Sequence, residues 1–168
     1  MGDVVTKSPR VGIGHDTHRL EPGGPLRLGG VDIDHDRHLV GHSDADVLLH
    51  AVTDALLGAA ALDDIGAMFP DTDAANANRD SADMLHRAWR RVAAAGYQIE
   101  NLDCVVLAQR PKLASHRQRI ATRIAEILDI AADRVGLKAK TGEGVGPIGR
   151  EEAITAQCVA LVTQVSRR

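Results

Sequence analysis

Acidic and imidazole side chains alternate in the opening segment "VGIGHDTHRL", where Asp16 and His18 are separated by one residue. Alternate side chains of an extended backbone point to the same side, so this spacing can present a carboxylate and an imidazole together. A catalytic zinc site needs a third protein ligand and an open fourth position. The segment "GHSDADVLLHAVTD" offers His50 as that ligand, and Asp46, one helical turn earlier, can hydrogen-bond the other ring nitrogen of His50.

The same residues also have ordinary structural interpretations. Ser43 and Asp46 form a variant of a capping box, and His50 can be a solvated surface residue. His42 and Ser43 lie at the expected helix start, where free N–H groups and the dipole suit a phosphate as readily as a cap. The "GIG" glycines do not make a dinucleotide-binding fingerprint, because that motif needs G-x-G-x-x-G at the opening of a helix.

Two loops in the second half of the chain carry further polar residues. In "AQRPKL", Arg110 and Lys112 flank a proline, which taken alone favours an ordinary strand-exit turn. In "KTGEGVGPIGRE", the Thr141 hydroxyl and the Glu143 carboxylate suit Mg²⁺ or Mn²⁺ that already carries phosphate oxygens. Glu143 can equally be solvated, and Arg150 can form an ion pair at an interface.

The composition limits the class of protein. The 168 residues predict a single domain over residues 10–168, preceded by a loose leader over residues 1–9. The net charge of −3 argues against nucleic acid as a partner, and no apolar run is long enough to predict a membrane span. Cys104 and Cys158 lie far apart in apolar surroundings, which predicts buried, reduced thiols in a cytoplasmic protein.

Hydrophobic periodicity predicts an α+β fold. Strands are expected at "RVGIG", which then enters a glycine turn, and at "LDCVVLA", "RVGLKAK" and "AITAQCVALVTQV", with a hairpin around Gly29 and Gly30. Helices are expected from Ser43, from Asp80 or Ser81 to Gly96, and across 120–128. This order predicts a mixed four-stranded sheet plus a small hairpin, with helices covering one face. The other face then needs a partner, so we expect an oligomer.

Together these residues resemble the 2-C-methyl-D-erythritol 2,4-cyclodiphosphate synthases, the cyclases of the non-mevalonate isoprenoid pathway. The segments "GIGHDTHRL", "GHSDADVLLHAVTDALLGAAALDDIGAMFPDTD" and "AQRPKL" occur in that family's order and spacing. The resemblance implies a homotrimer with active sites between subunits. It also implies conversion of 4-diphosphocytidyl-2-C-methyl-D-erythritol 2-phosphate to the cyclodiphosphate with release of CMP.

The resemblance also implies a role for each site residue. Asp16, His18 and His50 would hold Zn²⁺, Glu143 would bind Mg²⁺ or Mn²⁺, and His42 and Thr141 would support the transition state. The substrate would be bound by Asp16, Thr17, His18, His42, Ser43, Asp64, Ile65, Gly66, Phe69, Pro70, Asp71, Thr72, Asp73, Ala108, Gln109, Arg110, Pro111, Lys112, Leu113, Ala114, Lys140, Thr141, Gly142, Glu143 and Arg150. Within this set, the methylerythritol pocket would be lined by residues 64–66 and 69–73. Cytosine would be bound by residues 108–114, and the cytidine diphosphate by residues 140–143.

The chain departs from the family pattern in its last third. The family commonly shows T-T-E and G-F-T-G-R-G-E-G, whereas this chain has "KTGE" and "GPIGREEA". Pro147 stands in place of the phenylalanine that, in many members, helps line a central cavity for an isoprenoid diphosphate. A zinc phosphohydrolase and a non-catalytic metal- or isoprenoid-binding trimer are the alternative functions.

Overall fold

The structure, a computed structural model, describes residues 8–165 and contains one five-stranded sheet with the strand order β4-β1-β7-β5-β6. The strands are β1 (Pro9–Pro22), β4 (Arg37–Val40), β5 (Tyr97–Leu107), β6 (Val135–Lys140) and β7 (Ala153–Gln164), with β2 (Leu26–Leu28) and β3 (Val31–Ile33) forming a separate hairpin. The helices are α1 (Val47–Ala59), α2 (Ile65–Met68), α3 (Ser81–Ala94), α4 (Arg117–Leu128) and α5 (Gly146–Gly149), with 3-10 turns η1 (Ala74–Asn76) and η2 (Ala132–Arg134). The predicted leader lies almost entirely outside the described residues.

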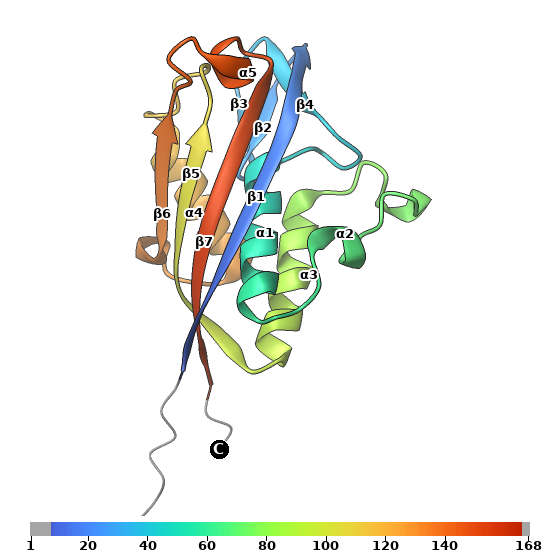
Figure 1. The fold of residues 1–168 in the computed structure, drawn as a ribbon, viewed down its shortest axis with the longest axis vertical. Coiled ribbons are helices and arrows are strands. Elements are labelled where there is room, and N and C mark those ends of the chain that lie inside the picture. The colour runs from blue at the N-terminus through green and yellow to red at the C-terminus, as the bar shows by residue number, and fades with distance from the viewer. Residues whose placement is uncertain (1–7, 166–168) are drawn as a thin grey trace, which may run out of the picture.

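The α+β class, the mixed sheet and the helical layer are confirmed. β5 and β6 are parallel while the other neighbours are antiparallel, and α1, α3 and α4 cover one face of the sheet (Figure 1). The predicted count of four strands is wrong, because β4 adds a fifth at the edge, where it pairs with the end of β1. β4 is only four residues long and has a single buried side chain, Leu39, so it carries almost no alternation.

The expected glycine turn after "RVGIG" is wrong, because β1 runs without a break through Asp16 and His18. Gly12 and Gly14 instead let α1 pack directly on the strand. A Cβ atom at Gly12 would lie 2.0 Å from the Ala55 carbonyl oxygen, and one at Gly14 would lie 1.8 Å from that of Ala51. Only glycine permits this approach of two backbones, so these glycines set the distance between the strand and the helix.

The helix expected from Ser43 begins at Val47, because Asp46 is its N-cap. The buried Asp46 carboxylate accepts hydrogen bonds from the backbone N–H groups of Leu49, Gly29 and Gly30, at 3.1, 2.8 and 2.6 Å. Burial raises the pKa of Asp46, and the three N–H donors offset part of that rise. Asp46 therefore ties the β2–β3 turn to the start of α1. The expected cap at Asp80 is confirmed for α3.

The sheet face opposite the helices carries exposed aliphatic side chains on neighbouring strands. Val11 and Ile13 of β1 are 66% and 70% exposed, and Val159 of β7, the register partner of Ile13, is 42% exposed. Cys104 and Cys158 are register partners on the opposite, helix-covered side, and both are buried free thiols as predicted. No helix within residues 8–165 has both the length and the apolar character needed to cross a membrane.

Candidate metal centre

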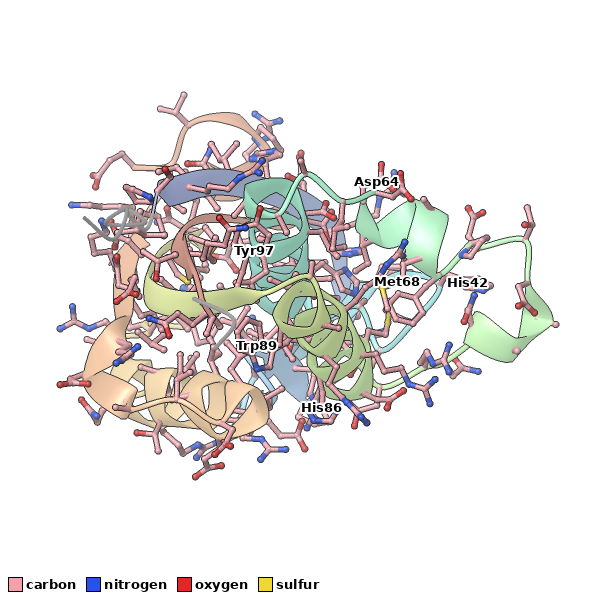
Figure 2. All side chains as sticks on the ribbon, turned by 90° about the horizontal axis from the view of Figure 1, so that it is seen from below. His42, Asp64, Met68, His86, Trp89 and Tyr97 are labelled. Atoms are coloured by element: carbon pink, nitrogen blue, oxygen red, sulfur yellow. The ribbon has the colours of Figure 1, made fainter. Side chains whose placement is uncertain are left out.

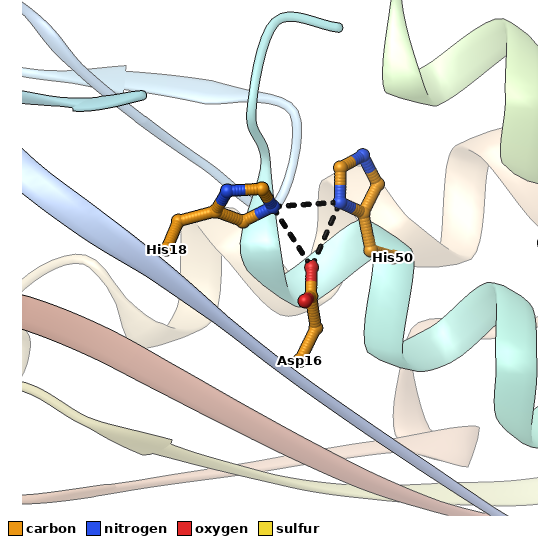
Figure 3. Close-up of side chains that lie close together, drawn as sticks. All are labelled: Asp16, His18 and His50. Atoms are coloured by element: carbon orange, nitrogen blue, oxygen red, sulfur yellow. Dashed lines mark hydrogen bonds and ion pairs between the residues drawn. The ribbon is translucent and has the colours of Figure 1, made fainter. Parts of the chain in front are cut away.

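Asp16, His18 and His50, the three metal ligands that the resemblance implies, converge on one point (Figure 3). Asp16 Oδ2 lies 2.9 Å from His18 Nε2 and 2.9 Å from His50 Nδ1, and the two nitrogens lie 3.1 Å apart. β1 supplies the first two side chains on one face, and α1 supplies His50. Ala51, beside His50, is the residue whose carbonyl lies over Gly14, so the close packing of α1 on β1 brings His50 into reach.

The ligand atoms of Asp16, His18 and His50 form a triangle. Hydrogen bonds on the outer side of each imidazole ring define which ring nitrogen faces the centre of that triangle. His18 Nδ1 lies 2.8 Å from the Val40 carbonyl oxygen. Because a carbonyl oxygen only accepts, Nδ1 carries a proton, and Nε2 is therefore the ring nitrogen that can offer a lone pair to a metal at the centre. His50 directs Nδ1 to the centre, and its Nε2 lies 3.1 Å from Ser43 Oγ and 2.9 Å from Ser81 Oγ.

The donor set and its dimensions fit a zinc ion. Ligand atoms held about 2.0–2.1 Å from a tetrahedral ion lie about 3.3 Å from one another, slightly farther apart than the three atoms observed here. Burial opposes ionisation of Asp16, but hydrogen bonds and the charges of His18 and His50 outweigh it and hold its pKa well below the ordinary value. For His18, burial is outweighed in the same way by Asp16, which raises the imidazole pKa. An ionised carboxylate beside two imidazoles is a set that zinc favours.

The expected contact between Asp46 and His50 is wrong. Asp46 is turned away from the triangle because its oxygens are occupied by three backbone N–H groups. Ser43 and Ser81 contact His50 Nε2 instead. The sequence predicts a site role for Ser43 but only a helix cap for Ser81, because nothing local relates Ser81 to a histidine 31 residues earlier.

A cavity of about 210 Å³ opens beside the triangle. Its walls include nine of the predicted site residues, namely Asp16, His18, His42, Ser43, His50, Ile65, Gly66, Phe69 and Asp71. In Figure 2, His42, Asp64 and Met68 lie on the same side of the molecule, away from Tyr97. The predicted residues Asp64, Pro70, Thr72 and Asp73 are outside the lining, although Asp64 and Asp73 cap α2 and η1 next to it.

Three residues that the sequence did not assign to the substrate also line this cavity: Asp54, Asn76 and Met84. Asp54 lies one helical turn beyond His50, which was the only local signal for it. Its carboxylate accepts the Ile65 N–H at 2.8 Å, and burial raises its pKa. Asp54 therefore joins α1 to α2 at the cavity wall.

A second, larger cavity of about 850 Å³ lies at the loop after β5. Of the seven residues predicted for cytosine, Gln109, Arg110, Pro111 and Lys112 line it, together with Asp34, His35, Asp36 and Glu151, which the sequence did not suggest. The guanidinium of Arg110 lies 3.4 Å from the Glu151 carboxylate.

The loop after β6 adjoins the loop after β5, because parallel strands end at the same sheet edge. The Ala108 N–H donates to the Lys140 carbonyl at 2.9 Å. Thr141 Oγ1 donates to Glu143 Oε1 at 2.8 Å, and Arg150 forms an ion pair with Glu152 at 2.8 Å. Lys140, Thr141, Gly142, Glu143 and Arg150 line neither of the two cavities, nor do Thr17, Ala108, Leu113 and Ala114. Within one chain, the predicted site residues are therefore divided between two cavities with no lining residue in common, and some of them line neither.

Two curated proteins with similar sequences are both named 2-C-methyl-D-erythritol 2,4-cyclodiphosphate synthase. They come from Rhodopirellula baltica and Cupriavidus necator. They are 56% and 57% identical over 155 and 157 residues, which is 92% and 94% of this chain and 93% of each relative.

Solved structures share the fold. The bifunctional IspDF of Campylobacter jejuni superposes with a TM-score of 0.92 at 38% identity, over 96% of this chain and 44% of that longer chain. The IspF–CDP complex of Plasmodium falciparum gives a TM-score of 0.84 at 33% identity, over 95% of this chain and 98% of that one. A model of the YgbB family matches residues 9–163. With nearly its whole length matched in sequence and in fold, this chain belongs to the YgbB family.

Proposed function

We propose that this protein is a cyclase of isoprenoid precursor synthesis. Its substrate is 4-diphosphocytidyl-2-C-methyl-D-erythritol 2-phosphate, and its products are 2-C-methyl-D-erythritol 2,4-cyclodiphosphate and CMP. It is a phosphorus–oxygen lyase acting in the cytoplasm, and the names of its relatives support this reaction. The observation that carries the proposal is the convergence of Asp16, His18 and His50 at the wall of a cavity.

Two metal ions complete the centre in this proposal. Asp16, His18 and His50 hold one Zn²⁺ per subunit, and Glu143 binds Mg²⁺ or Mn²⁺ together with the substrate diphosphate. When bound, the two cations polarise the phosphates and neutralise their charge. His18 and His50 contribute by presenting the lone pairs of neutral imidazoles. Asp16 contributes by staying ionised, as its lowered pKa indicates.

The reaction needs alignment more than a strong base. A phosphate monoester is already largely dianionic at pH 7, since its second pKa is about 6. Its oxygen attacks the β-phosphorus within the same molecule, the bond to the CMP oxygen breaks, and that oxygen leaves with the electron pair. The chain's part is to orient the two phosphates and exclude water. His42 and Ser43 at the cavity wall suit the first phosphate, and Thr141 suits the diphosphate.

A homotrimer with active sites between subunits accounts for the two separate cavities. The cavity at the metal centre suits the methylerythritol end of the substrate, and the cavity lined by 109–112 suits the cytidine end. If a neighbouring subunit brings its second cavity to this subunit's first, one substrate can span both. The exposed Val11, Ile13 and Val159 supply an apolar surface for that association.

Release of CMP from the authentic substrate tests the proposal. The zinc-loaded protein with Mg²⁺ or Mn²⁺ should release one CMP for each cyclodiphosphate formed. Absence of CMP would contradict the proposal and favour a non-catalytic metal- or isoprenoid-binding module.

Isotopically labelled water separates cyclisation from hydrolysis. The cyclase uses a substrate oxygen as the nucleophile, so its products acquire no oxygen from solvent. A zinc phosphohydrolase would instead place one solvent oxygen in its product. Label in the products, detected by mass spectrometry, would therefore reject the cyclase.

A further inference from the structure

We infer that Ser81 and Asp44 are positioning residues, which hold the His50 ring with the proton on Nε2 and so keep Nδ1 free to bind the metal. Neither residue belongs to the three ligands or to the cavity wall as described above. The inference rests on the proposed zinc site and extends it to the first residue of α3.

The Asp44 carboxylate fixes the orientation of the Ser81 hydroxyl. Asp44 Oδ2 accepts the Ser81 backbone N–H at 3.1 Å, and Asp44 Oδ1 accepts the Ser81 hydroxyl proton in a short hydrogen bond. Arg27 lies 3.8 Å from the same carboxylate and complements its charge. A serine hydroxyl has one proton, so once that proton is bound by Asp44, Ser81 Oγ can only accept from its other neighbour.

That other neighbour is His50 Nε2, 2.9 Å from Ser81 Oγ. Because Oγ accepts, Nε2 must donate, which leaves Nδ1, the atom that faces Asp16 and His18, as the nitrogen whose lone pair can bind a metal. Ser81 is fully buried, so water does not compete for this contact. A carboxylate, a hydroxyl and an imidazole thus form a chain of hydrogen bonds ending at the metal centre.

Ser43 Oγ is a weaker candidate for the same role. It lies 3.1 Å from His50 Nε2, and it accepts the Ala45 N–H at 3.1 Å. No described carboxylate binds the Ser43 hydroxyl proton, so that hydroxyl can donate to His50 as readily as it can accept. Of the two serines, only Ser81, whose hydroxyl proton is bound by Asp44, fixes His50 Nε2 as the donor of their hydrogen bond.

The test compares the zinc affinity of the wild-type chain, Ser81→Ala and Asp44→Asn, measured by competition with a chromogenic chelator. The first change deletes the acceptor. The second replaces a carboxylate with an amide that has a single accepting oxygen for the two donors of Ser81, which frees the hydroxyl to donate to His50. Loss of an outer contact of this kind typically weakens metal binding about 10- to 100-fold, and both variants should show a loss in that range.

Asp80→Ala is the matched control. Asp80 is the N-cap of the same helix and accepts the Ala82 N–H at 2.8 Å, so its removal perturbs the start of α3 without touching His50. This variant should bind zinc as the wild type does. A loss equal to that of Ser81→Ala would overturn the inference in favour of a general effect on the helix.

A direct readout of the His50 ring distinguishes positioning from packing. Long-range ¹H–¹⁵N NMR of the full chain before zinc addition should report a proton on Nε2 in the wild type, whether or not Nδ1 is also protonated, and a shift toward the form with its proton on Nδ1 alone in both variants. Zinc affinity and ring form unchanged in Ser81→Ala would overturn the inference and leave Ser43 as the acceptor. If Ser81→Ala does not fold, Asp44→Asn decides, since that side chain is partly exposed. Failure of the wild type to bind zinc would reject the proposed function itself.

Discussion

At the scale of single residues, the metal centre depends on side chains that are oriented by hydrogen bonds within the chain. Asp16 and His18 share one face of β1, and the Val40 carbonyl sets the His18 ring. His50 is held from outside by hydroxyl groups. The chain therefore orients these three side chains toward one point, and removing one should leave too few ligands to retain an ion.

His50→Ala should lose bound zinc and CMP release together. Outer-shell changes alone typically cost about 10- to 100-fold in affinity or activity, so loss of a ligand should cost more than about 100-fold. Elemental analysis and the CMP assay measure the two effects. His86→Ala, an exposed histidine on α3, is the control and should match the wild type. Zinc at one per subunit in His50→Ala would contradict the ligand assignment.

Glu143→Gln should raise the Mg²⁺ or Mn²⁺ concentration needed for half-maximal activity roughly tenfold, because affinity for hard cations follows the charge of the ligands. The glutamine still offers an oxygen to Thr141, which donates to Glu143 at 2.8 Å, so the loop should keep its shape. Zinc content serves as the internal control and should not change. An unaltered metal titration would remove Glu143 from the second site.

At the scale of elements, the contact between β1 and α1 positions the centre. Gly12 and Gly14 have no room for a side chain against the α1 backbone. The same helix is held at its start by Asp46, which also binds the β2–β3 turn. The separation of β1 from α1 thus determines both the packing of the core and the distance between Asp16 and His50.

Gly14→Ala should lower the free energy of unfolding by about 1–3 kcal/mol, the usual cost of overpacking, and should also weaken zinc binding, because α1 must move away from β1. Denaturant unfolding and chelator competition measure the two effects. Gly58→Ala is the control on the same helix: its Cβ would meet only the Ile13 carbonyl oxygen, at 3.9 Å. Alanine's helix propensity there should maintain or raise stability. A Gly14→Ala chain as stable as the wild type would contradict this account.

At the scale of the whole molecule, one sheet face is packed under helices and the other exposes aliphatic side chains. The two cavities share no lining residue, and all three residues of the metal centre come from one chain. In the proposed trimer, each subunit therefore binds zinc with its own residues, whereas catalysis requires residues of more than one subunit. A change that separates subunits should distinguish these two properties.

Ile13→Asp should dissociate the trimer, because it places a carboxylate on the apolar face. The resulting monomer should keep its zinc and lose CMP release. Light scattering after size exclusion gives the mass, and elemental analysis gives the zinc content. Gln118→Asp adds the same charge on exposed α4 and should remain a trimer. Full activity in a monomeric Ile13→Asp chain would place the whole site within one subunit.

The sequence by itself determined the features that depend on neighbouring residues. The shared direction of Asp16 and His18 follows from strand geometry, and the Asp80 cap follows from helix-end chemistry. The three long helices and the long strands follow from their apolar periodicity. The structure alone decided several other contacts between residues that are far apart in the sequence. It turned Asp46 toward the β2–β3 turn, placed Ser81 on His50, assigned Gly12 and Gly14 to helix packing, and added β4 to the sheet. These contacts depend on how close the packed backbones come, and no local pattern encodes that distance.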